Sequence, residues 1–157
     1  FEGLGVAKFG LNDFVGSIKD YEIALKLNPK ISTIYYSRGN SKMALKDFAG
    51  AISDFDKAIE IDPNYKSAYV NRGISKKNIK EFKESILDYE KALSINPKDA
   101  IALHNLALSK KEIGDIKGAC ADMKKSLSLG NSLASKFITI ECKVKSKATW
   151  LDLTSNS

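Results

Sequence analysis

Three segments decide the fold: KDYEIALKLNP at residues 19–29, SDFDKAIEIDP at 53–63 and LDYEKALSINP at 87–97. Their prolines, Pro29, Pro63 and Pro97, are equally spaced along the chain. Each segment has the apolar spacing of an amphipathic helix, and its proline predicts where that helix ends. A further helix-like segment precedes the second and third of them, IYYSRGNSK at 34–42 and AYVNRGISK at 68–76. The sequence therefore predicts repeated units of two helices joined by a tight turn.

Small and large side chains recur at fixed places in these units. With the 34-residue period and the helical hairpin, they resemble the tetratricopeptide repeat. The resemblance implies an all-α, right-handed superhelical solenoid of antiparallel helix pairs, in which small residues let two helices cross closely. The small residues are Gly5, Gly39, Gly73 and Ala107 in the first helices and Ser17 with Ala24, Ala51 with Ala58, Ser85 with Ala92 and Ala119 with Ser126 in the second, beside the larger Tyr21, Phe55, Tyr89 and Met123.

We expect a single domain over residues 1–145. A stacked array needs its last apolar face covered, so the amphipathic segment after the fourth repeat should be a capping helix. Residues 146–157 should form a C-terminal tail, either mobile or strapped onto the last helices. The expected repeats are about 1–31, 32–65, 66–99 and 100–131, and the capping helix is 132–145, with Leu133, Phe137, Ile140 and Val144 on one side.

Charged residues also recur with the repeat. Lysines in the first helices and aspartates in the second lie equally far from the turn, which predicts one ion pair per repeat. The alternative is a ladder of lysines that binds phosphates, which we disfavour because an acid recurs with every lysine. An acid just before each second helix can cap it or favour its start. Arg38 and Arg72 are expected to pack between units and to bond an acid of the preceding repeat. The pairs are Lys8 with Asp20, Lys42 with Asp54, Lys76 with Asp88 and Lys110 with Asp122, and the capping acids are Asp13, Asp47, Glu81 and Asp115.

The two cysteines, Cys120 and Cys142, lie equally far on either side of the turn near Asn131. An antiparallel hairpin can bring them opposite one another. They could then form a disulfide, or remain two small buried thiols that pack the capping helix. We favour the free thiols, because free cysteine is commonly buried.

The composition and the motifs exclude several classes of protein. A chain of 157 residues that is 43% hydrophobic is not disordered, and its charge-free stretches, at most ten residues long, predict no membrane span. It has one histidine and no GK[ST] phosphate loop, GxSxG or HExxH, so we expect neither an enzyme nor a cofactor or metal site. The chain lacks an initiator methionine and should be a fragment or a processed form. Its location is undetermined, with a soluble cytoplasmic protein slightly favoured.

In the family that this sequence resembles, the first helices line a concave face, and we take their exposed stripe as the candidate peptide-binding groove. Apolar anchors rimmed by amides, lysines and a histidine suit an extended peptide or a helix, and the lysines favour acidic side chains or a carboxylate. A lone histidine without a partner base is interpreted as a binding or surface residue. The groove residues are Tyr36, Asn40, Met43, Val70, Asn71, Ile74, Lys77, His104, Asn105, Leu108 and Lys111, and Thr33, Ser67 and Ile101 complete the stripe.

These features predict a non-enzymatic scaffold that binds a protein or peptide segment. The net charge of +6, concentrated in the C-terminal half, leaves binding of RNA or another polyanion as an alternative. The apolar groove disfavours nucleic acid as the partner. A third alternative is self-association through exposed terminal repeats, with the chain a monomer or a weak homo-oligomer.

Tetratricopeptide domains of the chaperone-cofactor type hold a terminal carboxylate with a clamp of Lys, Asn and Arg. Here Asn40 and Asn71 match the amide part of that clamp. The basic members are absent, because Tyr36, Ile101 and Asn105 occupy their places. We therefore expect weak or no binding to the acidic C-terminal tails of cytosolic chaperones.

Overall fold

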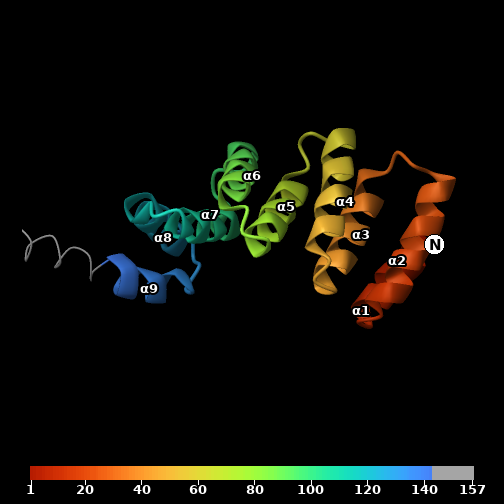
Figure 1. The fold of residues 1–157 in the computed structure, drawn as a ribbon, viewed down its shortest axis with the longest axis horizontal. Helices are drawn as coiled ribbons and strands as arrows, with labels where there is room; N and C mark the ends of the chain where they lie inside the picture. Colours follow the sequence, from red (N-terminus) through yellow and green to blue (C-terminus); the bar gives the residue numbers. More distant parts are fainter. Residues whose placement is uncertain (143–157) are drawn as a thin grey trace, which may run out of the picture.

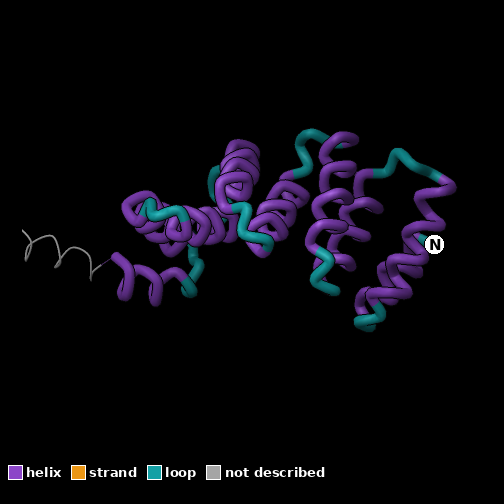
Figure 2. The backbone as a smooth tube through the Cα atoms, viewed as in Figure 1, coloured by secondary structure: helices purple, strands orange, loops and turns teal. Residues whose placement is uncertain are grey.

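The structure is a computed structural model that describes residues 1–142. Four antiparallel helical hairpins follow one another along an elongated array, and a shorter helical segment closes its C-terminal end (Figure 1). Within residues 1–142 every regular element is helical (Figure 2). The hairpins are α1 (Glu2–Gly10) with α2 (Phe14–Leu27), α3 (Ser32–Ala44) with α4 (Phe48–Ile61), α5 (Lys66–Asn78) with α6 (Phe82–Ile95) and α7 (Ala100–Glu112) with α8 (Ile116–Ser128), followed by α9 (Ala134–Phe137) and the π-helix η1 (Ile138–Cys142).

The array is an α-solenoid, because each hairpin packs on the next in the chain. The second helix of one unit lies against the first helix of the following unit, as α4 does against α5 and α6 against α7. The first helices α3, α5 and α7 also contact one another in succession. No helix of the described chain is long and apolar enough to cross a membrane.

Small residues at the helix crossings make the hairpins compact. A Cβ atom added to Gly39 would lie 2.7 Å from Cε1 of the Phe55 ring, and Gly73 stands in the same relation to Tyr89. Both rings are fully buried. In the fourth repeat Ala107 takes the place of glycine, and the buried residue opposite is the flexible Met123. The close approach predicted from the small residues is confirmed.

The turn inside each hairpin holds one residue in the left-handed conformation, as Lys80 does at φ 66°. The acid that follows caps the second helix in three repeats, where the Asp13, Asp47 and Asp115 carboxylates accept a backbone N–H from a glycine three residues on. Glu81 stands at the same position before α6 but makes no such bond, so of the two predicted roles it does not fill that of a side-chain cap. Its side chain is one methylene longer and does not bond the N–H that the shorter aspartates reach.

All four predicted Lys–Asp ion pairs form across the hairpins, with Nζ to carboxylate distances of 2.6–2.9 Å. The prediction for Arg38 is wrong: it donates two hydrogen bonds to Asp54 of its own repeat. Arg72 likewise bonds Asp88 of its own repeat, and in addition reaches Asp56 of the preceding one. In each case the aspartate lies across the hairpin from the arginine, within reach of two guanidinium nitrogens.

The capping segment differs from the expected single amphipathic helix. Phe137 packs against the last hairpin as predicted, together with Ala134 and Ile138. Leu133 and Ile140 are exposed, so the predicted apolar face is wrong for these two residues. The helix begins only at Ala134 and continues as a π-helix, which turns a different set of positions toward α8. Residues 143–145 of the predicted capping helix, Val144 among them, and the predicted tail at 146–157 lie outside the described residues.

Candidate functional site

Four of the predicted groove residues, Tyr36, Val70, Asn71 and Ile74, come together where the first helices α3, α5 and α7 meet. A hollow of about 190 Å³ opens there. Its apolar wall is formed by Tyr36, Val70, Ile74 and Ile101. The polar residues that complete the lining are Lys66, Ser67, Asn71 and Asp99.

Tyr36 is held firmly at this hollow. Its ring packs 4.9 Å from the Tyr65 ring and 5.9 Å from Phe55, measured between centroids. The Asn71 amide donates one hydrogen bond to the Tyr36 hydroxyl at 3.1 Å and another to the Asn40 carbonyl oxygen at 2.7 Å. Burial and the neighbouring Tyr36 raise the pKa of Tyr65 to about 12, so the Tyr65 ring stays neutral. Side chains fixed in this way lose little entropy when a partner docks.

An ion pair closes one end of the hollow. The Lys66 ammonium of α5 bonds the Asp99 carboxylate, which also accepts the backbone N–H groups of Ile101 and Ala102 at the start of α7. Burial acts to raise the pKa of Asp99, but the bond from Lys66 and the backbone donors outweigh it, and the pKa is lowered. The Asp99 carboxylate is therefore held in its charged form, and the Lys66 ammonium group neutralises it.

A second hollow lies farther toward the N-terminus on the first helices. Its volume is about 120 Å³, and it is lined by Val6 and Phe9 of α1, Tyr21, Ser37 and Asn40. Sequence reasoning missed Val6 and Phe9, although a shift by one repeat places them at the positions of Asn40 and Met43. The repeat equivalence was the signal that could have found them. Lys66 and Asp99 were also missed, and no repeated residue type marks them.

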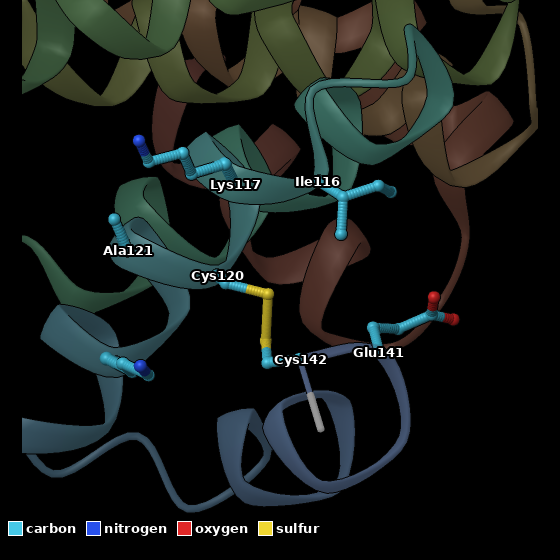
Figure 3. Close-up of a pocket in the computed structure, with 7 residues that line it drawn as sticks. Ile116, Lys117, Cys120, Ala121, Glu141 and Cys142 are labelled. Atoms are coloured by element: carbon cyan, nitrogen blue, oxygen red, sulfur yellow. A yellow bond between two sulfur atoms is a disulfide. The ribbon is translucent and has the colours of Figure 1, made fainter. Parts of the chain in front are cut away.

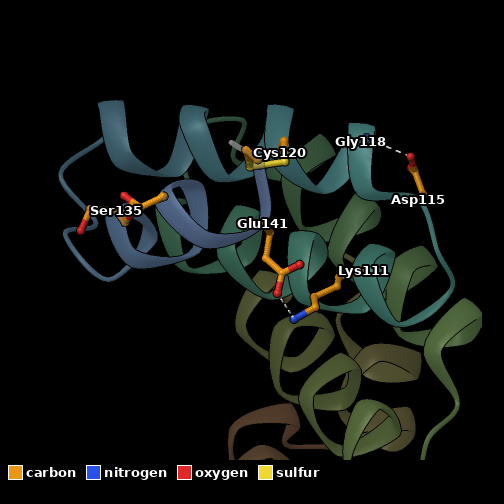
Figure 4. The surroundings of a disulfide bond; sticks show 8 residues. Lys111, Asp115, Gly118, Cys120, Ser135 and Glu141 are labelled. Carbon is orange, nitrogen blue, oxygen red and sulfur yellow. Dashed lines mark hydrogen bonds and ion pairs between the residues drawn. A yellow bond between two sulfur atoms is a disulfide. The ribbon is translucent and has the colours of Figure 1, made fainter. Parts of the chain in front are cut away.

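Three predicted groove residues are less open than a groove residue should be. Val70 is 7% exposed and belongs to the interior cluster with Tyr69, Ala92 and Ala102, so only its edge faces the hollow. Leu108 packs against the capping segment. Lys111 is paired with Glu141 of η1 (Figure 4). Packing of Val70 and Leu108 and the ion pair of Lys111 therefore leave these three residues less available to a partner than their sequence positions predict. Met43 is half-buried near the end of α3.

The remaining predicted residues lie between α5 and α7. The Lys77 ammonium donates a hydrogen bond of 2.9 Å to the Asn105 side-chain oxygen. His104 is half-buried, and its Nδ1 atom is buried without a hydrogen-bond partner among residues 1–142. Burial lowers the pKa of Lys77, and burial together with the Lys77 charge lowers the pKa of His104. The groove thus carries a partly desolvated cation beside a histidine that favours its neutral form.

The two cysteines form a disulfide between α8 and η1 (Figure 3). The Cα atoms of Cys120 and Cys142 are 5.8 Å apart, so the favoured prediction of two free thiols is wrong. The π-helical turn of η1 directs Cys142 toward α8, which an expected α-helical register did not reveal. A hollow of about 540 Å³ borders the disulfide, and its lining includes Lys117, Lys124 and Glu141.

The geometry of the recurrent lysines bears on the polyanion alternative. Each of the four is bonded to an aspartate, and two of these aspartates also bind an arginine. Phosphates would have to displace these carboxylates. Among residues 1–142, no group of three or more His, Cys, Asp or Glu side chains converges in a way that could hold a metal ion.

Comparison with known proteins agrees with this architecture. Models of the tetratricopeptide repeat match residues 32–65, 67–99 and 88–121. The chain belongs to the tetratricopeptide repeat family. The first hairpin of this tetratricopeptide repeat protein lies outside the matched residues, yet it keeps the glycine–ring contact, the capping aspartate and the Lys–Asp pair of the others. No curated protein matches the sequence.

Solved tetratricopeptide repeat structures are similar over most of the chain. MamA is 25% identical, with a TM-score of 0.78 over 81% of this chain and 74% of MamA. The Arabidopsis OM64 TPR domain is 27% identical, with a TM-score of 0.69 over 71% of this chain and 92% of that domain. The first TPR of Spaghetti (RPAP3), bound to the HSP90 peptide SRMEEVD, is 24% identical, with a TM-score of 0.70 over 71% and 89%.

Proposed function

We propose that this tetratricopeptide repeat protein is a non-enzymatic scaffold that binds an extended protein or peptide segment along its first helices. The hollow between α3, α5 and α7 carries the proposal, because it is open, preformed and apolar on one wall. Ile101 is 63% exposed at its edge, so its side chain is open to contact with a partner. An apolar residue of the segment would lie against Ile101, Ile74 and the Tyr36 ring.

Polar groups beside the hollow suit a peptide backbone. Asn71 uses its amide hydrogens to bond Tyr36 and Asn40, but its carbonyl oxygen is left to accept. The Asn40 amide and the Tyr36 hydroxyl hydrogen can each donate. A strand-like segment offers one carbonyl and one N–H per residue, which these groups could bond while an apolar side chain fills the hollow.

The ligand seen with the Spaghetti domain is not expected to transfer. That domain is bound to SRMEEVD. In this chain the positions that match the basic members of a carboxylate clamp hold Tyr36, Ile101 and Asn105. We propose weak or no binding of such a terminal carboxylate, and micromolar, carboxylate-dependent affinity for SRMEEVD in a titration would contradict this.

The function can be tested by selecting random 12-residue peptides on the immobilised full chain and measuring their affinities by calorimetry. Ile101→Lys should weaken the selected peptides at least tenfold, because it removes apolar contact and adds a charge at the hollow. Leu87→Lys is the matched control, since Leu87 is 65% exposed on α6, a second helix that does not border this hollow. Equal affinity for wild type and Ile101→Lys would reject the groove as the binding surface.

Self-association is a second candidate, supported by the outer face of α1. Phe1 and Leu4 are exposed there, whereas the residues at the same repeat position in α7, Leu103 and Leu106, are buried. A helix of another copy could cover this face. Sedimentation should then show a mass that rises with concentration and a monomer for Leu4→Glu. A wild-type chain that is monomeric at every concentration would contradict this.

A further inference from the structure

The first helices carry nine basic residues, and one of them differs from the rest. Eight form an ion pair with a carboxylate, whereas Lys77 bonds only the neutral side chain of Asn105 among residues 1–142. The paired residues are Lys8, Arg38, Lys42, Lys66, Arg72, Lys76, Lys110 and Lys111. In this protein a basic residue on these helices without a counter-ion is the exception.

The surroundings of Lys77 make a missing counter-ion costly. Its side chain is half-buried between α5 and α7, and burial lowers its pKa. An amide oxygen solvates an ammonium group but does not neutralise it, and a partly desolvated unpaired charge destabilises the fold. Beside it, His104 presents a buried Nδ1 atom without a partner in the described chain. Both polar groups of this corner are therefore incompletely satisfied within residues 1–142.

The acids of the described chain do not supply the missing charge. Glu112 acts on Lys77 through its electric field, but it is exposed and forms no ion pair with the ammonium group. Glu141 is bonded to Lys111, and Asp99 is bonded to Lys66. An ammonium group has three hydrogens, and Asn105 accepts one, so two remain for an added acceptor.

We propose that Lys77 receives the carboxylate of an aspartate or glutamate side chain from the segment bound in the groove. This inference rests on the function proposed above and adds the chemistry of the partner. Lys77 lies three positions after Ile74, which lines the hollow, so the two are roughly 4.5 Å apart along the axis of α5. An extended chain advances about 3.3 Å per residue, and the acid should therefore lie about one to three positions from the apolar anchor.

This carboxylate subsite differs from a general attraction to acidic ligands. The other basic residues of the first helices already have aspartate or glutamate partners, so one acid, at one register, should account for most of the preference. The aliphatic part of Lys77 can stay in place when its charge is removed, which makes Lys77→Met the informative variant. Lys91→Met is the matched control, because Lys91 is exposed on α6 and forms no ion pair within the described residues.

The test runs the peptide selection in parallel on full-length wild type, Lys77→Met, Lys77→Arg and Lys91→Met. Wild type, Lys77→Arg and Lys91→Met should enrich peptides with Asp or Glu within three positions of the apolar anchor. Lys77→Met should keep the anchor and lose the acid. For one selected peptide, Glu→Gln should weaken binding about tenfold to wild type and less than twofold to Lys77→Met.

The failures are distinguishable. Suppose that Ile101→Lys weakens the binding of the selected peptides, but that these peptides show no preference for an acid or show the same preference with Lys77→Met. This result overturns the carboxylate subsite and leaves the groove as the binding surface. Peptides that Ile101→Lys does not weaken, or no enriched peptide at all, overturn both proposals. A 12-nucleotide uridine RNA that binds wild type and is lost with Lys77→Met would assign the cation to phosphate and overturn the peptide assignment.

Discussion

Replacing Gly39 with alanine should destabilise the chain, because the new Cβ atom would lie 2.7 Å from Cε1 and 3.0 Å from Cδ1 of Phe55. The ring is fully buried, so it cannot turn aside without disturbing its neighbours. Overpacking of this kind costs about 1–3 kcal/mol. Alanine favours a helix over glycine by about 1 kcal/mol, which offsets part of that cost. We expect a net loss of up to about 2 kcal/mol, or up to roughly 8 °C in Tm.

The fourth repeat supplies the compensating change, because Ala107 faces Met123 where the earlier repeats pair glycine with a ring. Phe55→Met conserves volume approximately and should cost less than about 1.5 kcal/mol alone. In the double variant, the flexible methionine can move away from the methyl group introduced at position 39. The double-mutant cycle should therefore give a favourable coupling of about 1–2 kcal/mol.

Urea unfolding followed by far-ultraviolet circular dichroism measures these free energies, provided that the slope m is unchanged. Gly10→Ala is the control, since a Cβ atom there meets nothing within 4 Å and should not destabilise the chain. If Gly39→Ala is as stable as Gly10→Ala, or the two changes in the double variant are simply additive, then the glycine–ring contact does not set the spacing of the hairpins.

Three further changes test other parts of the structure. Asp54→Ala should cost about 2–4 kcal/mol in urea unfolding, because the Asp54 side chain is 3% exposed and holds two basic residues, whereas Glu60→Ala, in an exposed pair, should leave stability unchanged. Lys80→Gly should raise Tm by relieving a left-handed φ of 66°, a gain of about 0.5–1 kcal/mol; an unchanged or lower Tm would contradict this. Folding lowers the pKa of His104, so the unfolded chain binds a proton at a higher pH than the folded chain does. The stability that the neutral histidine contributes is therefore complete above the ordinary pKa of 6.5 and declines as the pH falls from there toward the folded pKa. Proton NMR of this single histidine should give a pKa below 6.5 that Lys77→Met raises only in part, because burial is the larger cause; a pKa at or above 6.5 would refute this.

Much of the fold could be predicted because each repeat is specified by contacts within its own hairpin. Gly39 meets Phe55 and Lys42 meets Asp54 inside one unit, and similar residue types recur one repeat later. A residue type that recurs at the same place in each repeat marks a structural position, and this can be recognised without knowing how neighbouring units pack. The capping aspartates recur in the same way, whereas the longer Glu81 at the equivalent position makes no side-chain cap bond.

The surface residues were harder to predict, because exposure depends on neighbouring repeats and on the ends of the array. Val70 has the sequence position of a groove residue, but it packs with Ala92 and Ala102 of the adjoining helices. Leu108 belongs to the fourth and last hairpin of the described chain, and the cap covers it. The capping segment has no counterpart in the other repeats, so the repeat period could not predict its π-helical turn.

The sequence by itself determined the number and direction of the helices in the hairpins, the places where they cross and the ion pairs inside each hairpin, since these depend on contacts at short separation that the period repeats. Only the tertiary structure decided which side chains remain open to a partner, that Cys120 joins Cys142, and that Lys77 has no carboxylate partner among residues 1–142. Those outcomes depend on how successive units and the cap are placed against one another, and no single repeat encodes that placement.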